Sequence, residues 1–422
     1  VIAFLVSIGP NLNSVPIIEP APLAFDDAGV PWSPRYGDIY HSAESAPGQA
    51  RHVFLAGNDL PTRWRDSNSF TILETGFGLG INFLATWQAW LESPGRCLRL
   101  CYVAVEKHPF SADALASLHA RYPEFAALSA PLRAQWPMLV PGVHRLSLAA
   151  GAVQLTLVLG DAHNILPSLV LGVDAIYLDG FAPARNPDMW SAPLIKAIAR
   201  RANPGCTLAT YTSAGTVRRA LQAAGFISEK RSGFGAKRDM LVARYAPRWP
   251  QRSAICVKPE IADRHAMIIG AGLAGAAVAE SLARRGWRIT LLDAADRVAS
   301  GASGLRAGAF HPHLSPDDCL LSRLSRNACL QAVRNWRALR DAGHPVHWAS
   351  CGLLQLPHRA SDERHMANTL SGLQYPESFA RYVSAKEAGE LAGCRVTTGG
   401  WFFPECGWLS SPSLVAALLT AA

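Results

Sequence analysis

Residues 265–295 read HAMIIGAGLAGAAVAESLARRGWRITLLDAA, and this pattern decides the fold of the second part of the chain. An apolar strand runs directly into Gly270, Gly272 and Gly275, which begin a helix leading to a second strand. Such glycines allow a tight turn, the approach of a pyrophosphate, and close helix packing, in that order. Asp293 ends the second strand, 18 residues after Gly275, where a ribose-binding carboxylate belongs. The stretch predicts a dinucleotide-binding unit with the phosphates at the helix N-terminus.

A second loop of small residues, SGASG (300–304), separates FAD from NAD as the expected dinucleotide. With Arg306 and Gly308 after it, the loop resembles the flavin oxidoreductases of the amino-acid oxidase and glycine oxidase type. In those enzymes the flavin takes a hydride from a carbon next to an amine nitrogen. We therefore expect FAD rather than NAD, with Ser303 and Arg306 beside the glycines and Asp293 in the binding site.

An earlier glycine turn, ETGFGLG (74–80), differs in that an acidic residue precedes GxGxG. The next strand ends in Glu106, and Asp161 follows the third strand. Three acids at successive strand ends resemble class I S-adenosylmethionine methyltransferases, where the glycine loop passes under the methionine and the later acids meet the ribose and the adenine. NAD binding by this half is the alternative. The predicted S-adenosylmethionine site consists of Glu74, Gly76, Gly78, Gly80, Glu106 and Asp161.

The sequence DGFAP (179–183) ends the fourth strand of the first part. Strand C-termini line the ligand crevice of an open α/β sheet, so Asp179 faces the place where methyl transfer would occur. A carboxylate there can orient an amine nucleophile and accept its proton. The alternative is an aspartate that hydrogen-bonds within its own turn. Phe181 is a candidate for stacking on a base, although an aromatic at a strand end is equally often part of the core.

Apolar runs alternate with helical patterns between these motifs, at 70–74, 100–106, 153–162, 174–181 and 206–212. This spacing predicts an α/β fold with a parallel, doubly wound sheet. We expect two Rossmann-like domains. The first is a methyltransferase domain over residues 1–250. After a linker over 251–264, residues 265–422 form a partial FAD-binding domain of the amino-acid oxidase type with a β-sheet insertion for the substrate.

The composition is that of a basic protein with a large core: 49% of residues are hydrophobic and the net charge is +8. No run approaches the ~20 apolar residues of a membrane span, and the opening VIAFLVSI lacks the features of a secretory signal. We therefore expect a soluble, cytoplasmic protein without a membrane partner. Nine cysteines without a CxxC pair indicate free thiols, and we expect no metal site. The positive balance is compatible with a nucleic acid partner but is weak evidence alone.

The motifs taken together, ILETGFGLGINFL (72–84), LDGFAPARNPDMW (178–190) and GASG (301–304), resemble the bifunctional tRNA 5-methylaminomethyl-2-thiouridine biosynthesis proteins (MnmC type). The resemblance implies an enzyme that modifies the wobble uridine of tRNA in two steps. An FAD half would remove the carboxymethyl group of 5-carboxymethylaminomethyl-2-thiouridine by oxidation. A methyltransferase half would then methylate the aminomethyl group from S-adenosylmethionine, with Asp179 beside the acceptor nitrogen.

The chain departs from this family at Leu79, where a Thr is usual, and at Leu305, where an Asn is usual. It begins with Val1 and ends in a helical pattern, and oxidases of this type need a further returning segment. We therefore expect a fragment whose flavin half binds FAD poorly. Two alternatives stay open: a fusion that acts on a free small-molecule amine, and a non-catalytic flavin half that serves as a docking platform for the methyltransferase.

Overall fold

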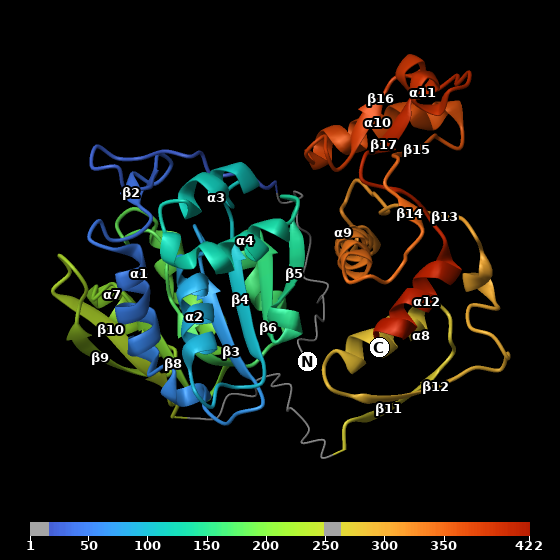
Figure 1. Ribbon diagram of the computed structural model, residues 1–422. Helices are drawn as coiled ribbons and strands as arrows, with labels where there is room; N and C mark the ends of the chain where they lie inside the picture. The colour runs from blue at the N-terminus through green and yellow to red at the C-terminus, as the bar shows by residue number, and fades with distance from the viewer. Residues whose placement is uncertain (1–16, 249–262) are drawn as a thin grey trace. The chain divides into compact units, whose positions relative to one another are not determined.

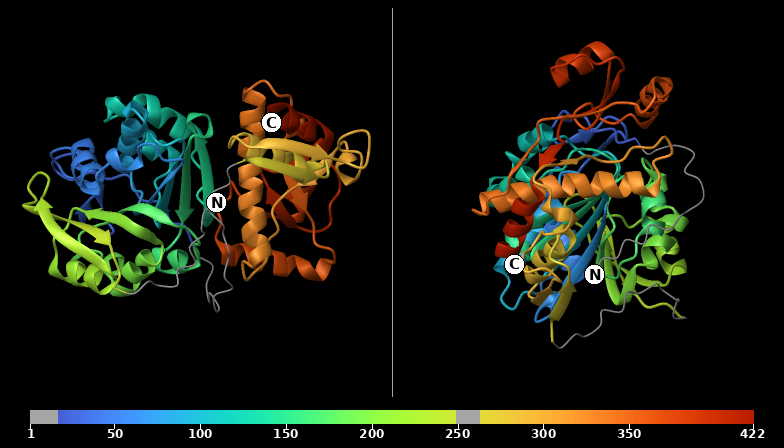
Figure 2. Two further views of the ribbon diagram at one scale, coloured as in Figure 1. Left: turned by 90° about the horizontal axis from the view of Figure 1, so that it is seen from below. Right: turned by 90° about the vertical axis from the view of Figure 1, so that its right-hand side faces the viewer.

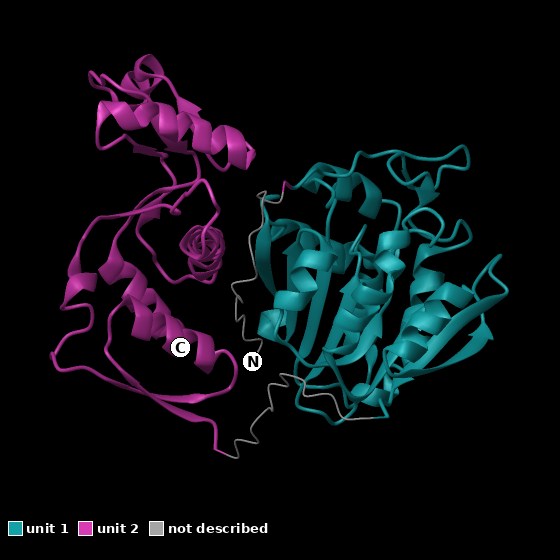
Figure 3. Ribbon diagram, turned by 180° about the vertical axis from the view of Figure 1, so that it is seen from behind, with its two compact units in different colours: residues 1–11, 18–258 teal, residues 12–17, 259–422 magenta. Residues whose placement is uncertain are grey.

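The computed structural model describes residues 17–248 and 263–422, which fall into two compact units (Figures 1 and 3). Unit 1 is built from the described residues up to 248, and unit 2 from residues 263–422. The opening run 1–8 and residues 251–262 of the predicted linker lie outside the described residues.

Unit 1 contains an eight-stranded sheet whose centre is parallel, as the sequence predicts. Strands β6, β4, β3, β7 and β8 run in one direction, whereas β5 and the β10–β9 hairpin at the two edges are antiparallel. The sequence reading missed these edge strands, because their half-exposed patterns lack the continuous apolar run of a buried parallel strand. In spatial order the strands are β5 (Gly142–Leu148), β6 (Val153–Leu159), β4 (Leu100–Glu106), β3 (Phe70–Thr75), β7 (Val173–Tyr177), β8 (Ala202–Thr210), β10 (Asp239–Tyr245) and β9 (Phe226–Ser232).

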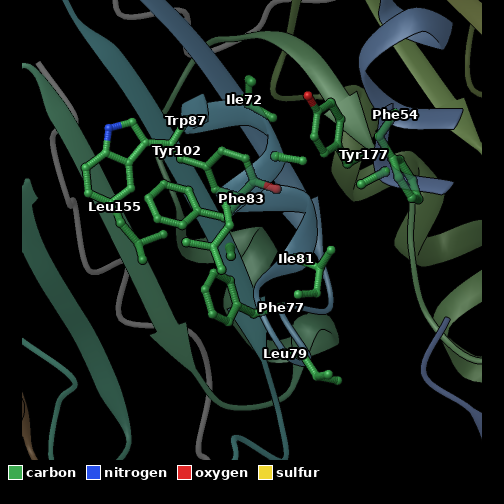
Figure 4. Packing of buried hydrophobic residues seen from close by; sticks show 14 of the residues in the cluster. Phe54, Ile72, Phe77, Leu79, Ile81, Phe83, Trp87, Tyr102, Leu155 and Tyr177 are labelled. Atoms are coloured by element: carbon green, nitrogen blue, oxygen red, sulfur yellow. The ribbon is translucent and has the colours of Figure 1, made fainter. Parts of the chain in front are cut away.

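Helices cover both faces of this sheet (Figure 2). The neighbours Ile72 and Leu73 of β3 are each 0% exposed and belong to different hydrophobic clusters, one on each face. Aromatic rings fill the first cluster, where Phe83 packs edge-on against Tyr102 (Figure 4). That face carries α1 (Ala46–Gln49), α2 (Ile81–Glu92), α3 (Ala112–His119) and α4 (Ala126–Ala134). The other carries α5 (Ala162–Ile165), α6 (Ala192–Ala199) and α7 (Gly215–Ala223).

Unit 2 begins with the predicted strand, glycine turn, helix and strand. Strands β11 (His265–Ile269) and β12 (Arg288–Leu292) pair in parallel, and α8 (Leu273–Ala283) connects them. Helix α12 (Ser411–Ala421) packs on α8 through small and branched side chains. The close approach of α8 to β11 depends on Gly275, because a Cβ there would lie 1.8 Å from the carbonyl oxygen of Gly270.

Two small antiparallel sheets complete unit 2. One has the order β13 (Gly308–Phe310), β18 (Gly407–Leu409), β14 (Trp348–Ala349). The other has the order β15 (Leu353–Gln355), β17 (Gly400–Phe403), β16 (Arg381–Val383). The helices of this part are α9 (Leu320–Asp341), α10 (Glu363–Leu373) and α11 (Ala385–Ala392). In residues 17–248 and 263–422, no helix has the length and apolar character needed to cross a membrane.

We predict that Gly275→Ala destabilises unit 2, because the added methyl group collides with backbone rather than with a flexible side chain. Overpacking of this kind costs about 1–3 kcal/mol, and we expect the upper end. Urea unfolding followed by tryptophan fluorescence measures the loss. Gly301→Ala is the matched control, because a Cβ at Gly301 meets nothing within 4 Å. Equal stability of the two variants would contradict the prediction.

Candidate functional site

A cavity of about 220 Å³ opens at the carboxyl edge of the unit 1 sheet. Its walls come from the turn after β3, from the ends of β4, β6 and β7, and from the segment 33–41. Parallel strands present their C-termini at one edge, so side chains far apart in sequence meet there. Seven of the predicted methyltransferase residues line the cavity: Gly76, Gly78, Glu106, Asp161, Asp179 and Phe181, and with them the predicted departure Leu79.

The glycine turn after β3 forms the floor of this cavity. Gly76, Gly78 and Gly80 have φ values of +109°, +50° and +75°, a backbone region that residues with a Cβ rarely adopt. A Cβ on Gly80 would also lie 2.6 Å from the ring of Phe77. Leu79 turns inward and is 4% exposed, so its side chain belongs to the core. The turn leaves room for a ligand to approach the backbone closely.

Glu106 and Asp161 sit at neighbouring strand ends and are held ready as hydrogen-bond acceptors. Glu106 Oε2 accepts from the Gly78 N–H at 2.8 Å, which ties the glycine turn to the end of β4. Asp161 Oδ2 accepts from Lys107 Nζ at 2.8 Å. Partial burial acts to raise the pKa of Asp161, but the hydrogen bonds from Lys107 and from the His163 N–H outweigh it and lower that pKa. Two ionised acceptors therefore lie side by side.

Asp179 lies on the wall of the cavity, just after β7. Its Oδ1 accepts from the Gly180 N–H and its Oδ2 from Asn82 Nδ2, both at 2.8 Å. Its backbone is fixed by Thr75, whose hydroxyl donates to the Asp179 carbonyl at 2.9 Å. Burial raises the pKa of Asp179 to about 6, although both hydrogen bonds favour the charged form. A carboxyl with this pKa is ionised at neutral pH yet able to take up a proton.

Glu74 is placed differently from the other predicted residues. It is 0% exposed and is not among the cavity-lining residues. It reaches the cavity only through Asn82, whose Nδ2 donates to Glu74 Oε1 at 2.8 Å. Burial and then the charge of Asp179 raise the pKa of Glu74 well above its ordinary value. A direct contact of Glu74 with S-adenosylmethionine stays a prediction.

Three aromatic rings stand beside Asp179, and the sequence reading named only one of them. Phe181 stacks on Tyr36 at 4.6 Å between ring centroids and meets Tyr40 edge-on at 5.0 Å. Asp38 Oδ2 accepts from the Ala182 N–H at 2.8 Å and so ties this segment to the Phe181 loop. The missed signal is the aromatic content of PWSPRYGDIYH (31–41), which the sequence reading took only for turn-forming chain.

Unit 2 brings most of its predicted dinucleotide residues to the N-terminus of α8. Asp293 Oδ2 accepts from the Ala271 N–H at 2.6 Å, and backbone hydrogen bonds, that one first, lower its pKa. Ser303 Oγ accepts from the Leu273 N–H at 3.0 Å, and a Cβ on Gly272 would lie 2.9 Å from that oxygen. The side chain of Arg306 is exposed, and no contact joins it to this group.

The donor set of unit 2 therefore fits the phosphate end of a dinucleotide. Free N–H groups at the start of α8 and a glycine turn without Cβ atoms suit an anion, and Asp293 suits a ribose. In the described ranges 17–248 and 263–422, no group of three or more His, Cys, Asp or Glu side chains is arranged to hold a metal ion.

Comparison with known families and proteins agrees with both halves. Residues 123–246 match a family model described as S-adenosyl-L-methionine-dependent methyltransferase, and residues 265–422 match one described as FAD dependent oxidoreductase. The chain is 52% identical, over 96% of its length, to the "tRNA 5-methylaminomethyl-2-thiouridine biosynthesis bifunctional protein MnmC" of Cupriavidus metallidurans. It is 50% identical, over 93% of its length, to the protein of that name from Ralstonia nicotianae. The resemblance drawn from the motifs is confirmed.

The chain spans only 61% and 60% of the length of these two relatives. Among solved structures, MNMC2 from Aquifex aeolicus matches with a TM-score of 0.44 and 21% identity, over 57% of this chain and 76% of that one. Glycine oxidase from Geobacillus kaustophilus matches with a TM-score of 0.31 and 25% identity, over 37% and 43%. Both TM-scores lie below 0.5, so these two likenesses carry no functional conclusion.

We predict that the Asp179 carboxyl titrates near pH 6 instead of the ordinary value of about 3.9. Between these pH values the folded state keeps a proton that the unfolded chain has released. This group's contribution to stability is therefore present at low pH and is lost as the pH rises through 6. NMR titration of a chain with ¹³C-labelled aspartate carboxyls measures the midpoint, and Asp179→Asn assigns the signal. A midpoint near pH 4 would contradict the prediction.

Proposed function

We propose, from the likeness to the bifunctional tRNA 5-methylaminomethyl-2-thiouridine biosynthesis proteins as premise, that this chain contributes both steps of wobble-uridine modification in tRNA. The flavin half removes the carboxymethyl group of 5-carboxymethylaminomethyl-2-thiouridine by oxidation. The other half transfers a methyl group from S-adenosylmethionine to the aminomethyl group that remains. We place the protein in the cytoplasm. The observation that carries the proposal is the position of Asp179 in the same cavity as the glycine turn, Glu106 and Asp161.

The cavity residues divide the work of methyl transfer between them. The glycine turn receives the methionine part of S-adenosylmethionine, and Glu106 and Asp161 accept hydrogen bonds from its ribose and adenine. Glu106 must give up or share its hydrogen bond with the Gly78 N–H when a ribose hydroxyl arrives. The rings of Phe181 and Tyr36 offer the acceptor base an aromatic platform.

Asp179 acts as the general base of this transfer. The nitrogen lone pair of the acceptor forms the new C–N bond, the C–S electrons stay with sulfur, and one N–H proton passes to Asp179. Its pKa of about 6 leaves the carboxyl ionised at neutral pH, so it can receive that proton. Its two anchored oxygens keep it in one orientation for the incoming amine.

In unit 2, the residues around the start of α8 would hold the pyrophosphate and ribose of FAD. When bound, FAD supplies hydride acceptance from the carbon next to the substrate nitrogen. Asp293 orients the N-terminal turn of α8 by accepting from the Ala271 N–H, and Ser303 occupies the Leu273 N–H. The Ser303 hydroxyl can rotate and donate to a phosphate oxygen once that N–H is taken over by the ligand.

We predict that Asp179→Ala lowers the rate of methyl transfer by about 10²–10⁴-fold, the usual contribution of a general base. The substrate is tRNA purified with its wobble position at the aminomethyl stage, and the readout is incorporation of label from S-adenosylmethionine. Binding of S-adenosylmethionine is expected to stay within a few-fold of the parent chain. Near-parental transfer by the folded variant would rule out Asp179 as the base.

Salt dependence separates tRNA from a free small-molecule amine as the substrate. Phosphate contacts release counterions, so we expect affinity for tRNA to fall at least about tenfold between 50 and 200 mM KCl. A small amine would show little change. The measurement is a binding titration with fluorescent hypomodified tRNA, with an uncharged nucleoside amine as the comparison. Flavin absorbance of the purified chain tests the remaining alternative, since methylation without bound flavin favours a docking role for unit 2.

A further inference from the structure

Asn82 stands between two carboxyl groups at the base of the cavity. It lies in the first turn of α2, and its Nδ2 donates to Glu74 Oε1 and to Asp179 Oδ2, each at 2.8 Å. An amide nitrogen carries two hydrogen atoms, so both are used on these two acids. One acid comes from the end of β3 and the other follows β7, and Asn82 is the direct bridge between them.

The two bridged acids lie in different environments. Glu74 is fully buried behind the cavity, and its Oε2 faces the Tyr102 hydroxyl without a hydrogen bond of good geometry. Asp179 lines the cavity, and its second oxygen is held by the Gly180 N–H. Two neighbouring carboxyls in a site of low polarity do not both ionise readily. The deeper acid keeps its proton, and the acid on the cavity wall carries the charge.

We propose that Asn82 is a positioning residue for methyl transfer, which fixes the Asp179 carboxylate against the neutral Glu74 so that the charged acid faces the acceptor amine. The inference rests on the proposed function. With Gly180 on one oxygen and Asn82 on the other, the plane of the Asp179 carboxylate is set by two donors from different elements. Glu74 anchors Asn82 from behind, so the amide cannot rotate away without leaving a buried carboxyl oxygen unpaired.

The protonation of this array involves few other groups. Glu74, Tyr102 and Tyr211 are the titratable side chains whose charges couple to Asp179. Burial, as the first cause, raises the pKa of both tyrosines, which keeps them neutral at physiological pH. Glu106 couples to Glu74 and further favours its neutral form. Removing Asn82 therefore acts on Asp179 itself, because the charges around it stay the same.

The test is a comparison of Asn82→Leu, Glu74→Gln and the matched control Gln88→Leu. Gln88 is an amide on the same helix whose Oε1 accepts from Arg51, and it is not among the cavity-lining residues. Each chain is examined by ¹³C titration of Asp179, by the pH profile of methyl transfer to aminomethyl-stage tRNA, and by S-adenosylmethionine affinity. Asn82→Ala replaces the leucine variant if that variant does not fold.

We expect Asn82→Leu to move the Asp179 midpoint to higher pH, since a donor to the carboxylate is lost. The acidic limb of the pH profile should move with it, and the maximal rate should fall about 10- to 100-fold while S-adenosylmethionine affinity stays within about threefold. Glu74→Gln should leave the Asp179 midpoint in place, because Glu74 carries no charge to remove. Gln88→Leu should match the parent chain throughout.

An unchanged Asp179 midpoint in Asn82→Leu overturns the inference, and so does a clear downward shift in Glu74→Gln, which would show that Glu74 is charged. If the parent chain transfers no methyl group to tRNA, the proposed function fails. The titration of Asp179 in Asn82→Leu does not depend on transfer, so it still decides whether the bridge controls this carboxyl.

Discussion

Every functional group of unit 1 depends on the parallel pairing of β6, β4, β3 and β7. Parallel pairing places the carboxyl ends of all four strands at one edge, where the chain must leave the sheet through a turn. The turn after β3 is closed by hydrogen bonds to both neighbours: the Gly76 N–H donates to the Val105 carbonyl at 2.9 Å, and Thr75 donates to the Asp179 carbonyl. A shift of register in any of these pairs would separate the acids that line the cavity.

The same edge gives carboxyl groups two opposite electrostatic environments. Glu106 and Asp161 receive hydrogen bonds from backbone N–H groups, and Asp161 also pairs with the Lys107 ammonium group. These acids are acceptors that stay charged. Glu74 and Asp179 lie deeper, where desolvation dominates over the hydrogen bonds from Asn82. Ligand binding and proton transfer can therefore be assigned to different acids on physical grounds, although all four are carboxylates at strand ends.

The sequence predicted the central strands, the two glycine turns and the acids at the strand ends, because each leaves a local signal. Apolar runs mark the buried strands, and glycine spacing marks the turns. Asn82 and Tyr36 left no such signal. A polar residue in the first turn of a helix is ordinary, and its role appears only when β3 and β7 are seen to lie side by side. Likewise, Tyr36 gains its meaning from stacking on Phe181, a contact across 145 positions of sequence. The edge strands β5, β9 and β10 were missed because their exposed faces interrupt the apolar pattern.

The two halves also differ in how much of each site one unit supplies. In unit 1 the glycine turn, the acids and the aromatic platform all come from residues 33–190, and they surround one cavity. In unit 2 the described residues gather the pyrophosphate and ribose end of a dinucleotide site around α8, while Arg306 stays apart from it. The strands there are also less enclosed: Ile269 of β11 is 85% exposed, whereas the matching glycine turn of unit 1 follows a fully buried strand. Methyl transfer can thus be measured on unit 1 groups alone, and its outcome does not depend on whether unit 2 retains a flavin.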